Sequence, residues 1–147
     1  MRIGIQNSQE LVPIRRQKVR QVAQKTLKHF NIGNDTCLNI LFIDDFHMSA
    51  LHERFLGKKG PTDVLAFGMQ EGRPLKGDTA LLGDIAISTQ TALRYAKRFR
   101  STAEREILLY VIHGILHLLG YDDHGKSARV KMRRKEQELL RTCQSGD

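Results

Sequence analysis

The fold is expected to form around Tyr110-Val-Ile-His-Gly-Ile-Leu-His-Leu-Leu-Gly-Tyr-Asp-Asp-His124. This segment continues an apolar run that begins at Ile107, so the helix it predicts is apolar on nearly every side. Such a helix is typical of the middle of a small domain. Gly120 then supplies the residue type that best tolerates the left-handed turn closing a helix. We therefore predict a buried helix that ends near Gly120, after which the chain turns back.

Two histidines, His113 and His117, interrupt the apolar run four residues apart. On a helix this spacing places both imidazoles on one face, one turn apart, where they can reach the same metal ion. Asp122, Asp123 and His124 follow the turn closely enough to supply a third ligand. Two histidines on a helix plus one histidine or carboxylate from the next turn are typical of a catalytic zinc, whose fourth position is left to water. The alternative is that each histidine is an ordinary core residue with backbone or water partners.

The motif His113-Gly-Ile-Leu-His-Leu-Leu-Gly-Tyr-Asp122 resembles the signature of the YbeY family, H-G-x-L-H-L-x-G-Y-D-H. These are bacterial metal-dependent endoribonucleases implicated in ribosomal RNA maturation. Two further blocks carry the resemblance over most of the chain. Pro61-Thr-Asp-Val-Leu-Ala-Phe67 is similar to the family's P-T-D-V-L-S-F, and Leu82-Gly-Asp-Ile-Ala-Ile-Ser88 is similar to its L-G-D-I-x-I-S.

The chain departs from the family pattern beside the second block. Leu56 occupies the position where the family commonly carries an arginine, which is thought to act in RNA binding or catalysis, and Ala66 replaces the family's serine. Position 56 of this chain therefore cannot supply the arginine's contact to RNA. The nearby cations Arg54, Lys58 and Lys59 are the candidates to contact substrate in its place.

Two residues, Asp123 and His124, are candidates for the third metal ligand. The family's third histidine falls six residues after the second, at Asp123 in this chain, and His124 is one step later. Spacing therefore favours Asp123, whereas the preference of zinc for imidazole in such sites favours His124, because a turn can absorb one residue. We favour His124 slightly, with Asp123 either binding the metal in its place or orienting a histidine.

The remaining patterns predict a single α+β domain over residues 1–147. We expect a mixed four-stranded sheet packed by about five helices, with the histidine-bearing helix at the centre. The strands are predicted at residues 2–7, 37–43, 64–69 and 81–88, and the other helices at 14–30, 46–55, 89–99 and 126–143. Asp84 lies in an otherwise apolar strand, so we expect it to bond backbone donors or a buried partner, with a contact to a metal-binding histidine as the alternative.

Composition bears on partners and on the cellular compartment. The net charge of +8 favours a polyanion such as RNA as partner. One basic cluster falls between two predicted helices, at Arg94, Lys97, Arg98, Arg100 and Arg105. No apolar stretch reaches the ~18 residues needed to cross a bilayer and the N-terminus lacks a signal-peptide core, so a cytoplasmic protein without membrane partner is expected. Cys37 and Cys143 are far apart, which predicts reduced thiols and no thiolate zinc site.

These observations predict a zinc-dependent endoribonuclease with one Zn²⁺ per chain. Zinc held by three protein ligands makes hydroxide available near neutral pH, and a basic surround favours attack on a phosphodiester. The resemblance implies single-stranded RNA as substrate, action on the 3′ end of small-subunit ribosomal RNA and in ribosome quality control, and the ribosome as partner; DNA is not expected.

Two other functions are weighed against this prediction. One is a ribosome-assembly factor that binds RNA around a structural zinc without cleaving it. The other is a zinc peptidase or amidohydrolase, but Gly114 stands where zinc proteases of the H-E-x-x-H type place the glutamate that activates water. The patterns do not indicate an oligomeric state.

Overall fold

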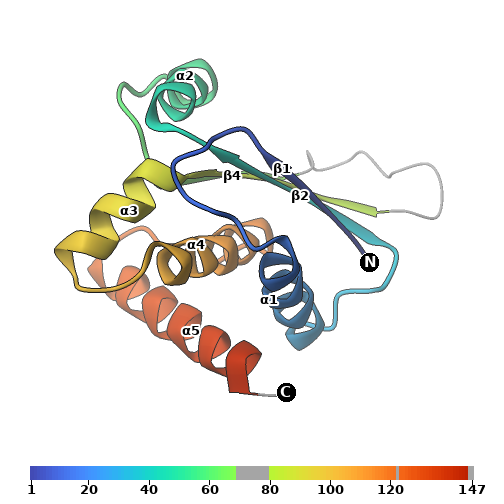
Figure 1. Cartoon of the computed structure of the whole chain (residues 1–147). Coiled ribbons are helices and arrows are strands. Elements are labelled where there is room, and N and C mark those ends of the chain that lie inside the picture. The colour runs from blue at the N-terminus through green and yellow to red at the C-terminus, as the bar shows by residue number, and fades with distance from the viewer. Residues whose placement is uncertain (69–79, 122, 146–147) are drawn as a thin grey trace.

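A mixed sheet of four strands forms one layer of the molecule (Figure 1). The structure is a computed structural model and describes residues 1–68, 80–121 and 123–145. The strand order is β1-β2-β4-β3, in which β1, β2 and β4 are parallel and the edge strand β3 is antiparallel to β4. The strands are β1 (Arg2–Asn7), β2 (Thr36–Ile43), β3 (Val64–Gly68) and β4 (Ala80–Ser88). The predicted mixed four-stranded sheet is confirmed.

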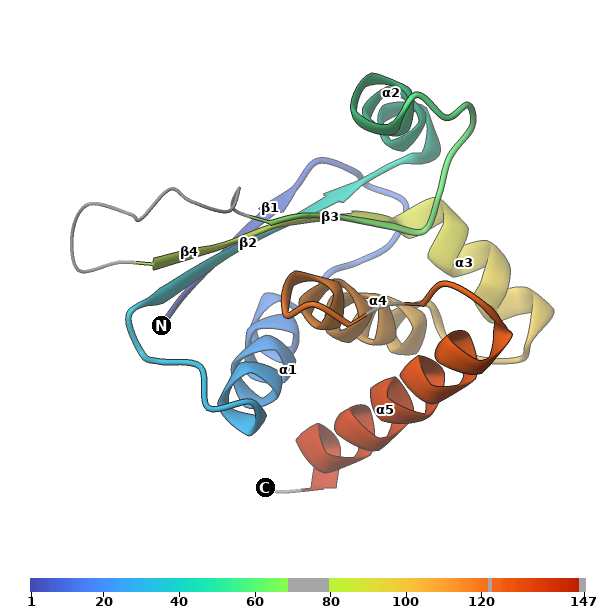
Figure 2. The same ribbon diagram turned by 180° about the vertical axis from the view of Figure 1, so that it is seen from behind.

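The helices are distributed unequally over the two faces of this sheet. They are α1 (Arg16–His29), α2 (Asp45–Leu56), α3 (Thr89–Arg98), α4 (Ala103–Leu118) and α5 (Lys126–Ser145). Helices α1, α4 and α5 lie on one side of the sheet, and α2 lies at one end on the other side (Figures 1 and 2). Helix α4 contacts α1, α3, α5, β3 and β4, so the histidine-bearing helix is central, as predicted. Within the described residues, no helix is long and apolar enough to cross a membrane.

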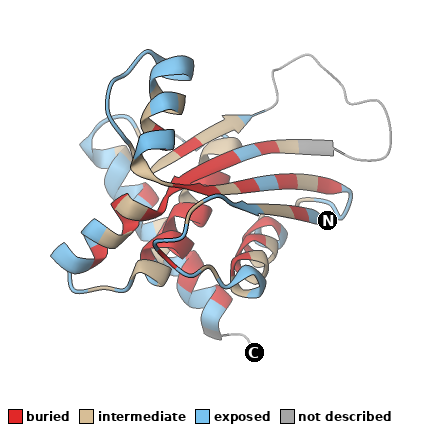
Figure 3. Cartoon of the chain, turned by 45° about the horizontal axis from the view of Figure 1, so that its top comes forward, coloured by how far each residue is buried: buried red, intermediate tan, exposed pale blue. Residues whose placement is uncertain are grey.

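The alternation of side chains along the strands separates two apolar clusters. In β4, Ile85 and Ile87 face the helix layer and join the main core with Ile112 and Ile115 of α4. Ala86 points to the other face, where it joins the smaller cluster that includes Met48 of α2. Figure 3 shows the buried residues concentrated where the sheet meets the helices. This packing encloses α4 along most of its length. Its polar side chains can therefore reach the surface only near the ends of the helix or along one narrow face.

Local hydrogen bonds and a left-handed glycine define the two ends of α4. Thr102 is the N-terminal cap and its side chain accepts a hydrogen bond from the Arg105 N–H, while Glu104 forms an ion pair with Arg15. The helix therefore begins at Ala103, directly after its cap. At the other end Gly120 has φ +97°, and the N–H of Tyr121 donates to the carbonyl of Leu116 at 3.0 Å. The predicted left-handed turn after the helix is confirmed.

The expectation for Asp84 was wrong. Its side chain is exposed on the face of β4 that carries Ala86, and it accepts a hydrogen bond of 3.0 Å from Asn39 Nδ2 on β2. Side chains alternate along a strand, so a residue next to the buried Ile85 points away from α4 and its histidines. The carboxylate therefore stays near solvent and needs no buried partner.

Candidate metal centre

His113 and His117 approach each other on one face of α4. Their Nε2 atoms are 3.0 Å apart and their ring centroids 4.6 Å apart, with the ring planes inclined at 72°. The i,i+4 spacing predicted this juxtaposition. Both side chains are partly buried at the end of a helix whose other faces are enclosed by the core. The two imidazoles thus present nitrogen atoms toward one point at the edge of the core.

The turn after α4 brings a carboxylate to the same point. Because Gly120 reverses the chain direction, Asp123 returns to the histidines, and its Oδ2 lies 3.4 Å from His117 Nε2 and 3.8 Å from His113 Nε2. One ligand atom from each of the three residues lies within 4.8 Å of the others. Two imidazole nitrogens and one carboxylate oxygen form a ligand set that suits a divalent transition metal such as zinc.

The other predicted site residues lie outside this group. His124 is exposed and is not among the three residues that come together, while Asp122 lies outside the described residues. Arg54, in the last turn of α2, and Lys58, in the loop that follows, are exposed. The guanidinium carbon of Arg54 lies 5.4 Å from the ring centroid of Phe55.

Sequence reasoning missed Glu136, which contacts His113 from α5. The carboxylate Oε2 accepts a hydrogen bond of 2.7 Å from His113 Nδ1, and Glu136 is a buried residue. A signal was present in the sequence: Glu136 falls at helical spacing between Met132 and Leu140, both buried, so it interrupts the apolar stripe of α5. A charged residue in such a stripe needs a polar partner.

Acidic neighbours raise the pKa of His113. Burial alone would lower the pKa of His113, but the hydrogen bond to Glu136 and the charges of Glu136, Asp63 and Asp123 together raise it. Burial raises the pKa of Tyr110, one turn earlier on α4, and the charges of Asp63 and Glu106 raise it further. Asp63 was not among the predicted site residues, yet its carboxylate acts electrostatically on both side chains. The surroundings of the histidines are therefore acidic and favour a bound cation.

A hollow of about 350 Å³ opens beside His117. It is lined by Leu56, by residues 64–68 of β3 and by His117 and Leu118. Leu56 and Ala66, two positions at which the chain departs from the family pattern, both line it. None of Arg54, Lys58 and Lys59 is among the lining residues, so these cations stand at the rim or beyond it.

Comparisons with known proteins agree with the architecture and the motif. The sequence model of the family described as "Endoribonuclease YbeY" matches residues 4–144. A protein of that name from Pelotomaculum thermopropionicum is 43% identical over 82% of this chain and 80% of its own length. Another from Syntrophus aciditrophicus is 36% identical over 95% of this chain and 88% of its own. The solution structure of TM1509 from Thermotoga maritima superposes with a TM-score of 0.60 at 25% identity, covering 99% of this chain and 95% of that one.

Proposed function

The chain belongs to the YbeY endoribonuclease family, and from this premise we propose that it is a metal-dependent hydrolase of single-stranded RNA. The observation that carries the proposal is the convergence of His113, His117 and Asp123 at the end of α4. We propose these three residues as the ligands of one Zn²⁺ per chain, with His124 as the alternative third ligand. The set offers three protein ligands, as catalytic zinc sites do.

The donor set and its surroundings fit such an ion. Because Glu136 accepts the hydrogen bond from Nδ1 of His113, the proton of the neutral imidazole is held there and the lone pair of Nε2 points toward His117. Asp123 contributes one negative charge to the ligand set, and Glu136 balances positive charge from outside it. Zinc bound there would acidify a water molecule and polarise a phosphoryl oxygen.

The surface beside the ligands gives the substrate a place to lie. The hollow next to His117 is open and apolar along Leu56 and β3, which suits a base or ribose more than a phosphate. We propose that Arg54 and Lys58, exposed on either side of Leu56 in the sequence, contact the RNA backbone at its rim. This assigns to them the role that the family's arginine has at the position of Leu56.

The family and the net charge of the chain support a proposal for the biological substrate. We propose that the enzyme matures the 3′ end of small-subunit ribosomal RNA and takes part in ribosome quality control in the cytoplasm, with the ribosome or its small subunit as partner. The net charge of +8 supports an RNA partner.

The peptidase alternative is disfavoured by the packing of Gly114. A Cβ atom at this position would lie 2.8 Å from two side-chain atoms of Ile85 on β4. The residue after the first histidine therefore faces the sheet at close range and has no space for a glutamate that could activate water. The chain lacks the base that H-E-x-x-H peptidases use.

The test is cleavage of a fluorescent single-stranded RNA by zinc-loaded protein. We expect cleavage that a chelator abolishes, and losses of at least about 100-fold in His113→Ala and His117→Ala, because removal of a ligand removes the metal-assisted step. His47→Ala is the matched control, since His47 is exposed on α2 and is not in the ligand group. Full activity in both site variants would contradict the proposal. Tight RNA binding without cleavage by the zinc-loaded protein would favour the non-catalytic assembly factor instead.

A further inference from the structure

Helix α3 carries a pair of stacked aromatic rings on its surface. The rings of Tyr95 and Phe99 lie with centroids 5.9 Å apart and planes inclined at only 9°. Tyr95 is 42% exposed and Phe99 is 60% exposed. The guanidinium carbon of Arg98 lies 5.4 Å from the Phe99 ring centroid. Two parallel exposed rings beside cations form the kind of platform on which a nucleic acid base stacks.

Tyr95 also lines a cleft of about 790 Å³. The cations Arg94, Lys97 and Arg98 line it from α3, and Pro61, Thr62 and Asp63 line it from the segment before β3. Helix α3 itself contains no acidic residue. The cleft therefore places the Tyr95 ring beside three cations, and the Phe99 ring stacks on Tyr95 outside the lining. Aromatic rings beside positive charge are the combination that tracks a single strand.

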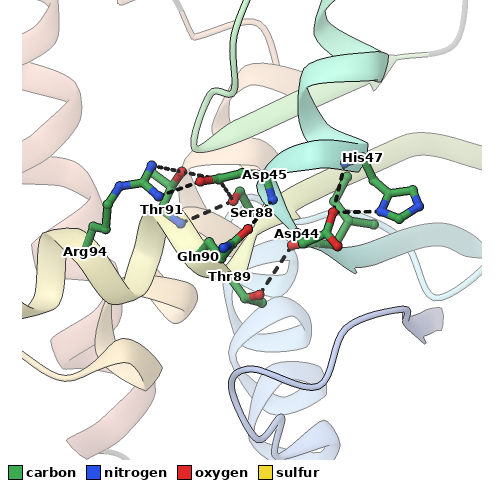
Figure 4. A network of polar contacts seen from close by, with 9 residues as sticks. Asp44, Asp45, His47, Ser88, Thr89, Gln90, Thr91 and Arg94 are labelled. Carbon is green, nitrogen blue, oxygen red and sulfur yellow. Dashed lines mark hydrogen bonds and ion pairs between the residues drawn. The ribbon is translucent and has the colours of Figure 1, made fainter.

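Figure 4 shows that Arg94, one of the three cations, belongs to a polar network at the start of α3. Arg94 forms an ion pair with Asp45, whose other oxygen accepts hydrogen bonds from Ser88 Oγ at 2.6 Å and Thr91 Oγ1 at 2.9 Å. These bonds fix the start of α3 against the start of α2. Within the described part of the chain neither Lys97 nor Arg98 forms an ion pair, so both remain available to an anionic ligand.

The cleft and the hollow beside His117 are lined by neighbouring parts of one segment of chain. The wall of the cleft includes Asp63, and the backbone carbonyl of this residue accepts a hydrogen bond of 2.9 Å from the Ser88 N–H at the base of α3. Strand β3 begins at the next residue, Val64, and lines the hollow that contains His117. Residues 61–63 of one short segment therefore line the cleft, and residues 64–68 of the same segment line the hollow.

We propose that the α3 cleft binds single-stranded RNA on its way to the metal centre, with a base stacked on Tyr95 and Phe99 and phosphates paired with Lys97 and Arg98. The inference rests on the proposed function and deepens it, because it gives the substrate a second contact surface besides the hollow at His117. A stacking platform holds any base, so the contact is independent of sequence.

The experiment measures RNA affinity directly, without cleavage. A fluorescent single-stranded oligonucleotide is titrated with the full chain in chelator, and binding is followed by anisotropy. We expect Tyr95→Ala and Phe99→Ala each to weaken binding about tenfold, within the range for loss of one stacked base. Tyr95→Phe, which keeps the ring, should bind like the unmodified chain. So should Phe46→Ala, since Phe46 is 77% exposed and lies on α2.

The salt dependence of RNA binding tests the proposed phosphate contacts of Lys97 and Arg98. Each phosphate contact on a single strand contributes a slope of about −0.7 to the dependence of log K on log salt. The Lys97→Ala/Arg98→Ala double variant should therefore flatten the slope by about 1.4. An abasic oligonucleotide of equal length should bind the unmodified chain and Tyr95→Ala with equal affinity, because it has no base to stack.

The outcomes separate this inference from the proposed function. If Tyr95→Ala and Phe99→Ala keep the unmodified affinity for RNA, the cleft is not an RNA surface, even if the chain cleaves RNA normally. The same result would be expected if the exposed rings bind an acidic protein instead. If binding depends on the rings but the zinc-loaded chain cleaves no RNA, the inference stands and the endoribonuclease proposal fails. Thermal unfolding of each variant verifies that it is folded.

Discussion

Glu136 Oε2 lies 2.7 Å from His113 Nδ1 and joins α5 to the metal-facing side of α4. An acceptor on the second ring nitrogen fixes the tautomer and orientation of a metal-binding histidine. We predict that Glu136→Gln lowers zinc affinity about tenfold, because the amide oxygen still accepts the hydrogen bond but the negative charge is lost. Competition with a chromogenic chelator measures the dissociation constant.

The matched control for this change is Glu138→Gln. Glu138 is exposed on the same helix, two residues away. Its substitution changes net charge by the same amount and should leave zinc affinity unaltered. Equal affinities for the two variants would mean that Glu136 supports the packing of α5 and has no effect on the metal.

A second prediction concerns the third ligand. Asp123→Ala should lower the zinc bound per chain to well below one equivalent, because the only carboxylate in the ligand group is removed. His124→Ala should retain about one equivalent. Elemental analysis after dialysis against a weak chelator measures both. The reverse result, with loss in His124→Ala alone, would assign the third ligand to His124 and require the turn after Gly120 to rearrange.

Most of the fold could be predicted because its elements have strong local signals. The periodicity of residues 81–88 indicated β4, and the apolar run of residues 107–119, interrupted only by its histidines and Gly114, indicated a central helix. Strand order was beyond reach, because parallel pairing of β1 with β2 and β2 with β4 depends on contacts between distant segments. Asp84 was misjudged for a related reason: whether a strand face is covered depends on α2, which shields only one end of that face.

The histidine pair of the candidate site could be predicted, whereas its surroundings could not. Spacing alone places His113 and His117 together, since both lie on one helix. Glu136 is 23 residues from His113 in the sequence, and its role depends on how α5 packs against α4. Asp63 likewise acts electrostatically on His113 because the strand that follows it, β3, pairs with β4. Long-range packing of this kind leaves a weak trace in one sequence, such as a charge within an apolar stripe.

Removal of the metal should lower stability without unfolding the chain. The two apolar clusters are formed by residues other than the three ligands, so the apo protein retains its core. Zinc at 100 times its dissociation constant adds about 2.7 kcal/mol. This corresponds to roughly 5 to 10 °C in the thermal midpoint. Differential scanning calorimetry with and without chelator measures the shift, and the His113→Ala/His117→Ala double variant should not respond. Complete unfolding in chelator would instead indicate a structural metal.

Asp45 should make stability depend on pH in the acid range. Burial alone would raise the pKa of Asp45, but hydrogen bonds from Ser88, Arg94 and Thr91 and the charge of Arg94 outweigh it and lower the pKa. A lowered pKa in the folded state means that the unfolded chain takes up the proton first as pH falls. The stabilisation is therefore present at neutral pH and is lost below about pH 4.

The corresponding variant is Asp45→Asn. At pH 7 we expect it to lower the free energy of unfolding by about 2 kcal/mol, because charged hydrogen bonds are lost. The difference from the unmodified chain should shrink as pH falls below about 4. Urea denaturation at several pH values measures it, and Glu10→Gln, at an exposed carboxylate, is the control. A difference independent of pH would show that the Asp45 charge does not stabilise the junction of α2 and α3.

Gly114 sets how closely α4 approaches the sheet. A Cβ atom there would meet the Cδ1 and Cγ2 atoms of Ile85 at 2.8 Å, so Gly114→Ala must displace the Ile85 side chain, the helix or the strand. Overpacking costs about 1 to 3 kcal/mol, which outweighs the gain of roughly 1 kcal/mol in helix propensity. We predict a net loss in urea denaturation, which is smaller when Gly114→Ala is introduced into the Ile85→Val background, because valine lacks Cδ1 and keeps only the Cγ2 contact at 2.8 Å. An equal loss in the two backgrounds would contradict this explanation.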